Sequence, residues 1–88
     1  MIRRRVVVHG RVQMVGFRVF VAARARSRGV VGWVGNRSDG TVEGVLEGER
    51  EAVDAVIAAC ESGPRGADVS DVDVSDEEPE GLRGFEIR

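Results

Sequence analysis

The sequence of 88 residues contains no lysine and no tyrosine, and it has only one cysteine, one histidine and two prolines. With Cys60 alone no internal disulfide can form, and Cys60 with His9 cannot complete a zinc site. The absence of lysine excludes a Walker-type phosphate loop and a Schiff-base lysine. No apolar run approaches the roughly 20 residues that a membrane-spanning helix needs.

The N-terminal residues also lack the features of a secretory signal. Met1 to Arg5 leads directly into the strand-like Val6–Val8, without an apolar h-region or a small-residue cleavage site. Together with the single cysteine, this favours a reducing, cytoplasmic setting. The length is that of a single domain over residues 1–88, built around one two-layer core.

Charge is unevenly distributed along the chain. All 13 basic residues are arginine; nine lie in residues 1–44 beside only two acids, whereas residues 45–88 hold four arginines and 13 acids. Such asymmetry is compatible with a basic face for an anion, and equally with two halves that neutralise each other in the fold. At Arg3–Arg5 we expect a solvated N-terminus rather than a phosphate-attracting patch.

Hydrophobic spacing predicts an alternating series of strands and helices. Apolar residues recur at helical spacing over 17–28 and between Gly48 and Gly63, and strand-like patterns cover 4–9, 30–36, 41–47, 68–75 and part of 82–88. The order β-α-β-β-α-β with right-handed crossovers places both helices on one face of a mainly antiparallel sheet. The predicted fold class is therefore α+β, a ferredoxin-like sandwich.

The sequence lacks the residues that most kinds of catalytic site require. His9 lies in a predicted strand and Cys60 on the apolar face of a predicted helix, where each is expected to be structural. The acidic segment 71–76 lacks the glycine and the bidentate glutamate of a calcium loop. We therefore set aside a histidine or cysteine catalyst and a calcium loop.

One segment, from Gly10 to Arg18, has the composition of an anion site. It joins the first strand to the first helix, and its consecutive N–H groups can form a nest at the helix N-terminus. An arginine in the first helical turn opposes the helix dipole unless an anion lies beside it. From the residues alone, Arg18 is either such an anion ligand or an ordinary surface arginine.

Two spaced motifs resemble the signatures of the acylphosphatase family. The first is Gly10-x-Val12-Gln13-x-Val15-x-Phe17-Arg18, and the second is Gly32-Trp33-Val34-x-Asn36-x-x-x-Gly40-x-Val42. The resemblance implies the same fold and the hydrolysis of acyl phosphates to a carboxylate and inorganic phosphate, without a cofactor. It also implies that inorganic phosphate is both product and competitive inhibitor. The small size and the lack of an evident apolar patch favour a monomer, and we expect no nucleic-acid or membrane partner.

The same resemblance implies roles for individual residues. Arg18 would bind the phosphate and Asn36 would orient the attacking water. Backbone amides would form a phosphate cradle, contributed by Gln13, Met14, Val15, Gly16, Phe17 and Arg18. Two residues depart from the family pattern: Met14 replaces a glycine that can adopt positive φ, and Gly35 replaces a longer side chain beside Asn36.

Three other classes of function share this predicted fold or site. An RNA-binding module has the same element order but needs stacking aromatics, and the first and third predicted strands contain none. A non-catalytic domain that senses an anion would keep the nest without turnover. A metal chaperone would need a C-x-x-C motif, which is absent.

Overall fold

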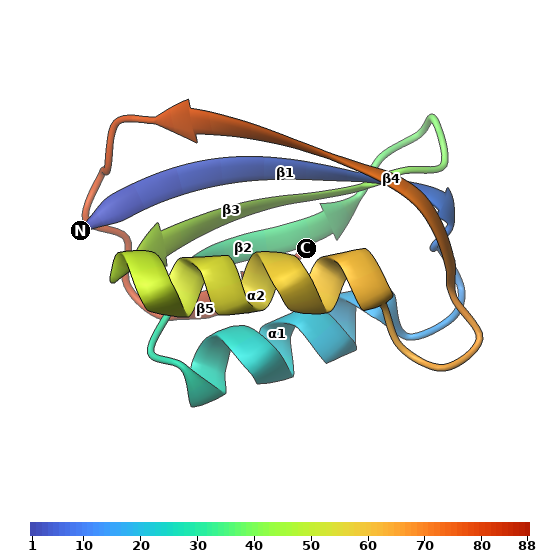
Figure 1. Ribbon diagram of the computed structural model, residues 1–88, viewed down its shortest axis with the longest axis horizontal. Coiled ribbons are helices and arrows are strands. Elements are labelled where there is room, and N and C mark those ends of the chain that lie inside the picture. The colour runs from blue at the N-terminus through green and yellow to red at the C-terminus, as the bar shows by residue number, and fades with distance from the viewer.

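A computed structural model describes residues 1–88 as two helices and one five-stranded sheet. The elements are β1 (Ile2–Arg11), α1 (Phe17–Ser27), β2 (Val31–Asn36), β3 (Val42–Gly48), α2 (Arg50–Ser62), β4 (Asp68–Glu77) and β5 (Phe85–Ile87). The strand order is β4-β1-β3-β2-β5, and every pair is antiparallel except β2 with β5. The ferredoxin-like α+β arrangement expected from the sequence is thus confirmed (Figure 1).

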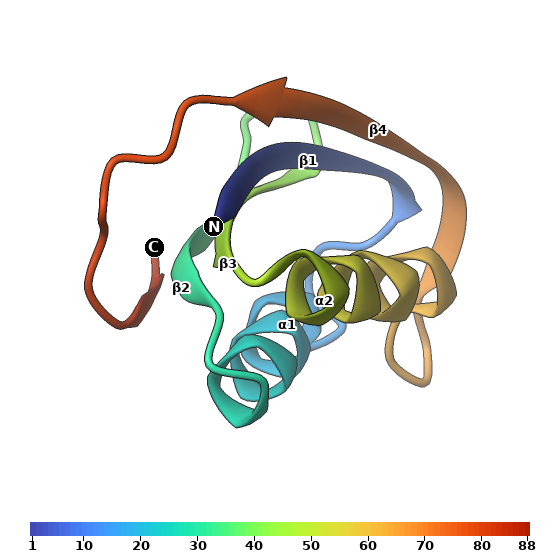
Figure 2. The same cartoon turned by 60° about the vertical axis from the view of Figure 1, so that its left-hand side comes forward.

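Both helices cover the same face of the sheet, and the core lies between the two layers (Figure 2). Their buried residues are those that the helical spacing predicts: Phe17, Val21, Ala22 and Ala25 from α1, and Val53, Val56, Ile57 and Cys60 from α2. Neither helix has the length and apolar character that a membrane-spanning helix requires.

The two faces of β1 have opposite characters. Val6 and Val8 are buried toward the helices, while Arg3 and Arg5 point to the other face of the sheet. Arg3 is only 6% exposed, and its guanidinium donates to Glu47 Oε2 at 2.9 Å and to Glu77 Oε1 at 2.8 Å. The expectation of a solvated N-terminus is therefore wrong, because β1 lies inside the sheet between two strands that carry acids.

A buried carboxylate connects this ion-pair network to the segment between β4 and β5. Glu47 is fully buried, and it accepts hydrogen bonds from Arg3 and from the three consecutive backbone amides of residues 80–82, at 2.8 to 3.1 Å. Burial alone would raise the pKa of Glu47, but these four donors outweigh it and lower the pKa below its usual value. The contacts fix the path by which the chain reaches β5 at the far side of β2.

A bulge in β1 prepares the loop that leads to α1. The pairing of β1 with β4 shifts register between His9 and Gly10. Gly10 has a φ of 119°, and a Cβ at this position would lie 2.1 Å from the carbonyl oxygen of Asp68. Only glycine fits so close an approach, which accounts for the glycine that opens the first motif.

Candidate active site

The loop between β1 and α1 is held against the hairpin of β2 and β3. The side-chain amide of Gln13 donates to the carbonyl oxygens of Arg37 at 2.8 Å and Thr41 at 3.0 Å. Both acceptors belong to the connection between β2 and β3. The Gln13 side chain therefore joins the loop to the hairpin on which Asn36 lies, a role that the motif alone did not reveal.

The backbone of this loop twice adopts the left-handed conformation. Met14 has a φ of 64° and Gly16 a φ of 76°. Met14 is the only non-glycine residue of the protein with positive φ, as expected for a side chain standing in place of a family glycine. Its side chain is 100% exposed, so it extends into solvent and does not fill the site.

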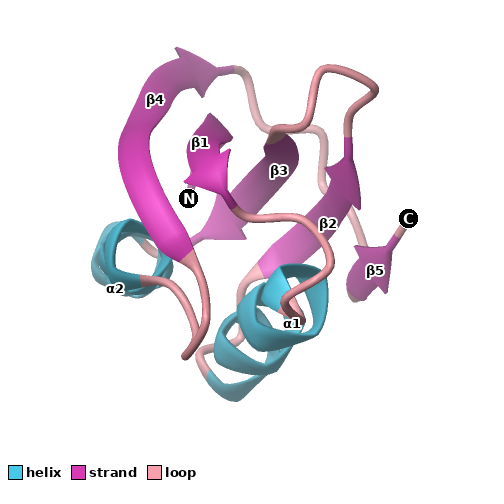
Figure 3. Cartoon of the chain, turned by 90° about the vertical axis from the view of Figure 1, so that its right-hand side faces the viewer, coloured by secondary structure: helices cyan, strands magenta, loops and turns pink.

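The N-terminus of α1 has no anionic group of its own. Gly16 is the N-cap and provides no side-chain hydrogen bond, and the first turn contains no acid. The free N–H groups at a helix N-terminus carry partial positive charge and attract anions. Figure 3 looks onto the end of the sheet where this loop descends from β1 to α1.

Arg18 lies in that first turn without a side-chain carboxylate as partner. Its Nη1 donates to the main-chain oxygen of Arg88, the last residue of the sequence, at 2.9 Å, and no Asp or Glu side chain forms an ion pair with it. By contrast, Arg3, Arg4 and Arg5 all bind carboxylates. No side-chain carboxylate therefore competes with a ligand for Arg18.

A cavity of about 160 Å³ brings Arg18 together with Asn36, the last residue of β2. Its lining comes from the loop, α1, β2 and β5, and consists of Val12, Met14, Gly16, Phe17, Arg18, Val19, Asn36 and Ile87. Of the residues predicted for the cradle, Gln13 and Val15 do not line the cavity. Val19 and Ile87 do line it, and only the folded chain places them there.

Gly35, the second departure from the family pattern, lies in a strand that stays paired to its end. Gly35 is opposite Glu43, and Asn36 is opposite Val42. A Cβ on Gly35 would lie 3.3 Å from the Cβ of Arg88, whose guanidinium stacks over the ring of Trp33 at 4.5 Å. The glycine thus gives room to the residue whose carbonyl oxygen accepts from Arg18.

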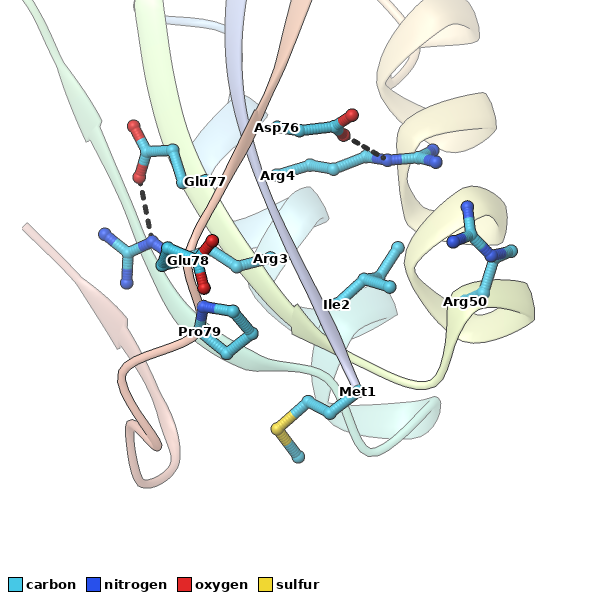
Figure 4. Close-up of a pocket in the computed structure, with 9 residues that line it drawn as sticks. All are labelled: Met1, Ile2, Arg3, Arg4, Arg50, Asp76, Glu77, Glu78 and Pro79. Carbon is cyan, nitrogen blue, oxygen red and sulfur yellow. Dashed lines mark hydrogen bonds and ion pairs between the residues drawn. The ribbon is translucent and has the colours of Figure 1, made fainter.

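A second, larger hollow of about 250 Å³ lies near the N-terminus, at the opposite end of the sheet from the β1–α1 loop (Figure 4). Arginines and acids both line it. Arg4 spans from β1 to Asp76 on β4 at 3.2 Å and to Asp54 on α2, so its charge is already neutralised. Because Asp76, Glu77 and Glu78 line this hollow beside its arginines, it is a poorer anion site than the cavity at Arg18.

The remaining candidates for chemistry have structural roles. Cys60 is buried in the core, and this burial raises the pKa of its thiol to about 12, which leaves no thiolate at neutral pH. His9 Nε2 lies 2.8 Å from Oδ2 of Asp73 on the neighbouring strand β4. Neither residue lines the cavity at Arg18.

The chain is similar to known proteins along nearly its whole length. The family model described as Acylphosphatase matches residues 4–87. An acylphosphatase of Trichormus variabilis is 51% identical over 88 residues, which is 100% of this chain and 87% of the relative. An acylphosphatase of Thermococcus kodakarensis is 50% identical over 86 residues, covering 98% and 94% of the two chains.

The fold is also similar to solved structures. The crystal structure of acylphosphatase from Bacillus subtilis superposes with a TM-score of 0.97 at 40% identity, covering 100% of this chain and 99% of the other. A structure of an acylphosphatase from Coxiella burnetii gives 0.95 at 36% identity, covering 99% and 92%. With a family model that matches residues 4–87 and relatives about 50% identical along its length, the chain belongs to the acylphosphatase family.

Proposed function

We propose that the protein hydrolyses acyl phosphates to a carboxylate and inorganic phosphate in the cavity shared by Arg18 and Asn36. The observation that carries the proposal is the guanidinium of Arg18, which has no side-chain carboxylate partner, beside an uncapped helix N-terminus, both lining one small cavity. Family membership supports the same reaction. In this proposal the backbone amides from Gln13 to Arg18 and the Arg18 side chain bind the phosphoryl group.

The chemistry of the substrate matches what the site offers. An acyl phosphate is a mixed anhydride whose carboxylate leaves readily, so its hydrolysis needs no covalent nucleophile and no strong general acid. The reaction needs positioning and stabilisation of charge on the phosphoryl oxygens. Backbone donors and a forked guanidinium, fixed before the substrate arrives, are suited to both tasks.

Asn36 orients the attacking water in this proposal. A neutral amide can hydrogen-bond a water molecule, but it is too weak a base to remove its proton. The proton passes instead to a phosphoryl oxygen of the substrate, so that water adds to phosphorus as the bond from phosphorus to the acyl oxygen breaks. The products are a carboxylate and inorganic phosphate, with no residue changed.

Further properties belong to the same proposal. We expect metal-independent turnover, competitive inhibition by inorganic phosphate, and a cytoplasmic monomer with a single domain over residues 1–88. We expect no membrane or nucleic-acid partner. The sheet face opposite the helices supports the last point, because the carboxylates of Glu43, Glu77 and Asp73 occupy it where RNA-binding domains stack bases on aromatics.

Hydrolysis of benzoyl phosphate in EDTA tests the proposal directly. We expect Arg18→Ala to lower kcat/KM about a thousandfold or more and to abolish binding of inorganic phosphate in calorimetry, since both depend on its charge. Asn36→Ala should keep phosphate binding and lower kcat about a hundredfold, because only the water loses its orientation.

Arg24→Ala is the matched control, because Arg24 is an exposed arginine on the same helix that does not line the cavity. Near-normal kcat/KM in both Arg18→Ala and Asn36→Ala would contradict the proposal. Phosphate binding through Arg18 without turnover would assign the chain to the anion-sensing class instead.

A further inference from the structure

Exposed apolar side chains gather around the proposed site. Five large apolar side chains are exposed in this protein, and three of them line the cavity that holds Arg18 and Asn36. These three form what we call the apolar rim: Met14 at 100% exposure, Val19 at 64% and Ile87 at 39%. Exposed apolar groups clustered at one cavity are typical of a surface that a ligand covers.

The apolar rim is continuous with the polar groups of the site. Val19 follows Arg18 on α1, and Ile87 lies on β5 opposite Val34, two residues before Asn36 on β2. The floor between rim and polar groups is also apolar, because Val12 and Phe17 are buried there. One ligand can therefore contact the guanidinium at one end and the rim at the other.

The cavity contains no second charged side chain. Arg18 is the only ionisable residue in its lining. A substrate with a carboxylate, an ammonium or a second phosphate on its acyl group would find no partner there, and that group would lose part of its hydration without compensation. With about 160 Å³, the cavity holds the phosphoryl group and the start of the acyl group, and the rest of the chain would lie along the rim.

From these contacts we infer that the acyl group of the substrate is an uncharged hydrocarbon and that Val19 and Ile87, with Met14 at the edge, form its binding surface. The inference rests on the proposed function and specifies its substrate class. Val19 and Ile87 are specificity-determining residues in this view, since they contact the acyl group and not the reacting atoms.

A series of straight-chain acyl phosphates tests the inference. Acetyl, butyryl and hexanoyl phosphates have leaving groups of nearly equal basicity, so differences in kcat/KM report binding of the chain. We expect kcat/KM to rise about two- to fourfold per added methylene, because each methylene is transferred from water into contact with the apolar rim. Succinyl phosphate, whose chain ends in a carboxylate, should be a poorer substrate than butyryl phosphate. A flat series, or a preference for succinyl phosphate, would overturn the inference while hydrolysis itself stands.

Three substitutions to threonine locate the effect. Val19→Thr exchanges a methyl for a hydroxyl on the exposed face of α1, and it should reduce the ratio of hexanoyl to acetyl kcat/KM severalfold, through KM. Val74→Thr is the matched control, since Val74 is 45% exposed on β4 and lies outside the cavity; it should keep the full ratio. Equal ratios in the two variants would contradict the role of Val19. Ile87→Thr adds the β5 side of the rim, with thermal unfolding as a check that β5 remains folded.

Binding of phosphonates separates this inference from the hydrolysis proposal. Methylphosphonate and hexylphosphonate are not hydrolysed, and their affinities can be measured by calorimetry without any turnover. Tighter binding of hexylphosphonate in the wild type, lost in Val19→Thr, would support the rim even for a protein that hydrolyses nothing. Equal affinities of the two phosphonates would overturn it.

Discussion

Met14 shows how a single residue in the β1–α1 loop can carry a conformational cost. A residue with a side chain at a φ of 64° is destabilised by about 1 to 2 kcal/mol relative to the right-handed region, whereas glycine has no such penalty. Glycine loses more freedom on folding, which offsets part of the difference. The departure at Met14 is thus tolerated in the fold, and its side chain remains in solvent.

Met14→Gly should therefore stabilise the protein by up to about 1 kcal/mol, measured by urea unfolding. Gly16→Ala is the matched opposite, because Gly16 has a φ of 76° and a Cβ there would meet nothing within 4 Å. It should destabilise by about 1 kcal/mol through the backbone alone. A loss of stability in Met14→Gly would mean that the methionine side chain makes contacts that outweigh its backbone strain.

At the scale of elements, the segment between β4 and β5 depends on Glu47. Its carboxylate is the common acceptor for Arg3 and for the amides of residues 80–82, and β5 follows directly with the lining residue Ile87. No regular pairing holds this segment, so its position relies on a side chain from β3. A change at Glu47 therefore acts on the end of the chain that completes the cavity.

Glu47→Gln should cost about 3 kcal/mol of unfolding free energy, because it leaves buried donors without a charged partner. Glu43→Gln, on the same strand but partly exposed, should cost less than about 1 kcal/mol. Hydrogen exchange at the amides of residues 80–82 should accelerate in the first variant and not in the second. Equal costs in the two variants would show that the buried carboxylate does not anchor the segment.

The helices and strands could be predicted from the local sequence pattern, whereas the contacts between residues far apart in the sequence could not. Apolar spacing from Phe17 to Ala25 places α1 to within one residue of its observed end, and the two motifs place Arg18 and Asn36 at the ends of elements that meet. The side chain of Gln13 binds carbonyls of a distant turn, and Ile87 reaches the cavity through parallel pairing with β2. Neither contact has a periodic signal in the sequence.

The wrong expectation at Arg3 has the same origin. A run of arginines at an N-terminus is usually solvated, and composition gives no reason to expect otherwise. Arg3 is buried because β1 lies inside the sheet, where Glu47 and Glu77 from the two neighbouring strands converge on it. That convergence depends on the register of three strands, which a local pattern does not contain.

At the scale of the whole molecule, the uneven distribution of charge between the two halves of the sequence stabilises the folded state. Hydrogen bonds from Arg5 and Arg3 on β1 lower the pKa of Glu77. The donors to Glu47 lower the pKa of that carboxyl, and hydrogen bonds from Thr41 lower the pKa of Asp39. A carboxyl whose pKa is lowered in the folded state binds fewer protons than in the unfolded chain. The stabilisation that such a carboxyl provides is complete above its pKa in the unfolded chain. It is lost as the pH falls through its pKa in the folded protein.

We therefore expect the unfolding free energy to decrease progressively below the ordinary glutamate pKa of 4.5, and to change little from these groups above it. Urea unfolding between pH 7 and pH 3 measures this dependence. Glu77→Gln should be less stable than the wild type at neutral pH and should show a shallower decline toward acid. A stability that stays constant down to pH 3 would contradict the linkage.

The acids of β4 have a consequence beyond the single molecule. β4 is an outer strand of ten residues with free backbone groups along one side, and such an edge can pair with a second chain. Its exposed carboxylates, Asp68, Asp71, Asp73 and Asp76, repel the same edge of another copy, while β5 at the opposite edge has only three residues to offer. Solubility therefore depends on the ionisation of these carboxylates. When acid protonates them the repulsion disappears, and aggregation would begin with a second chain pairing along the β4 edge.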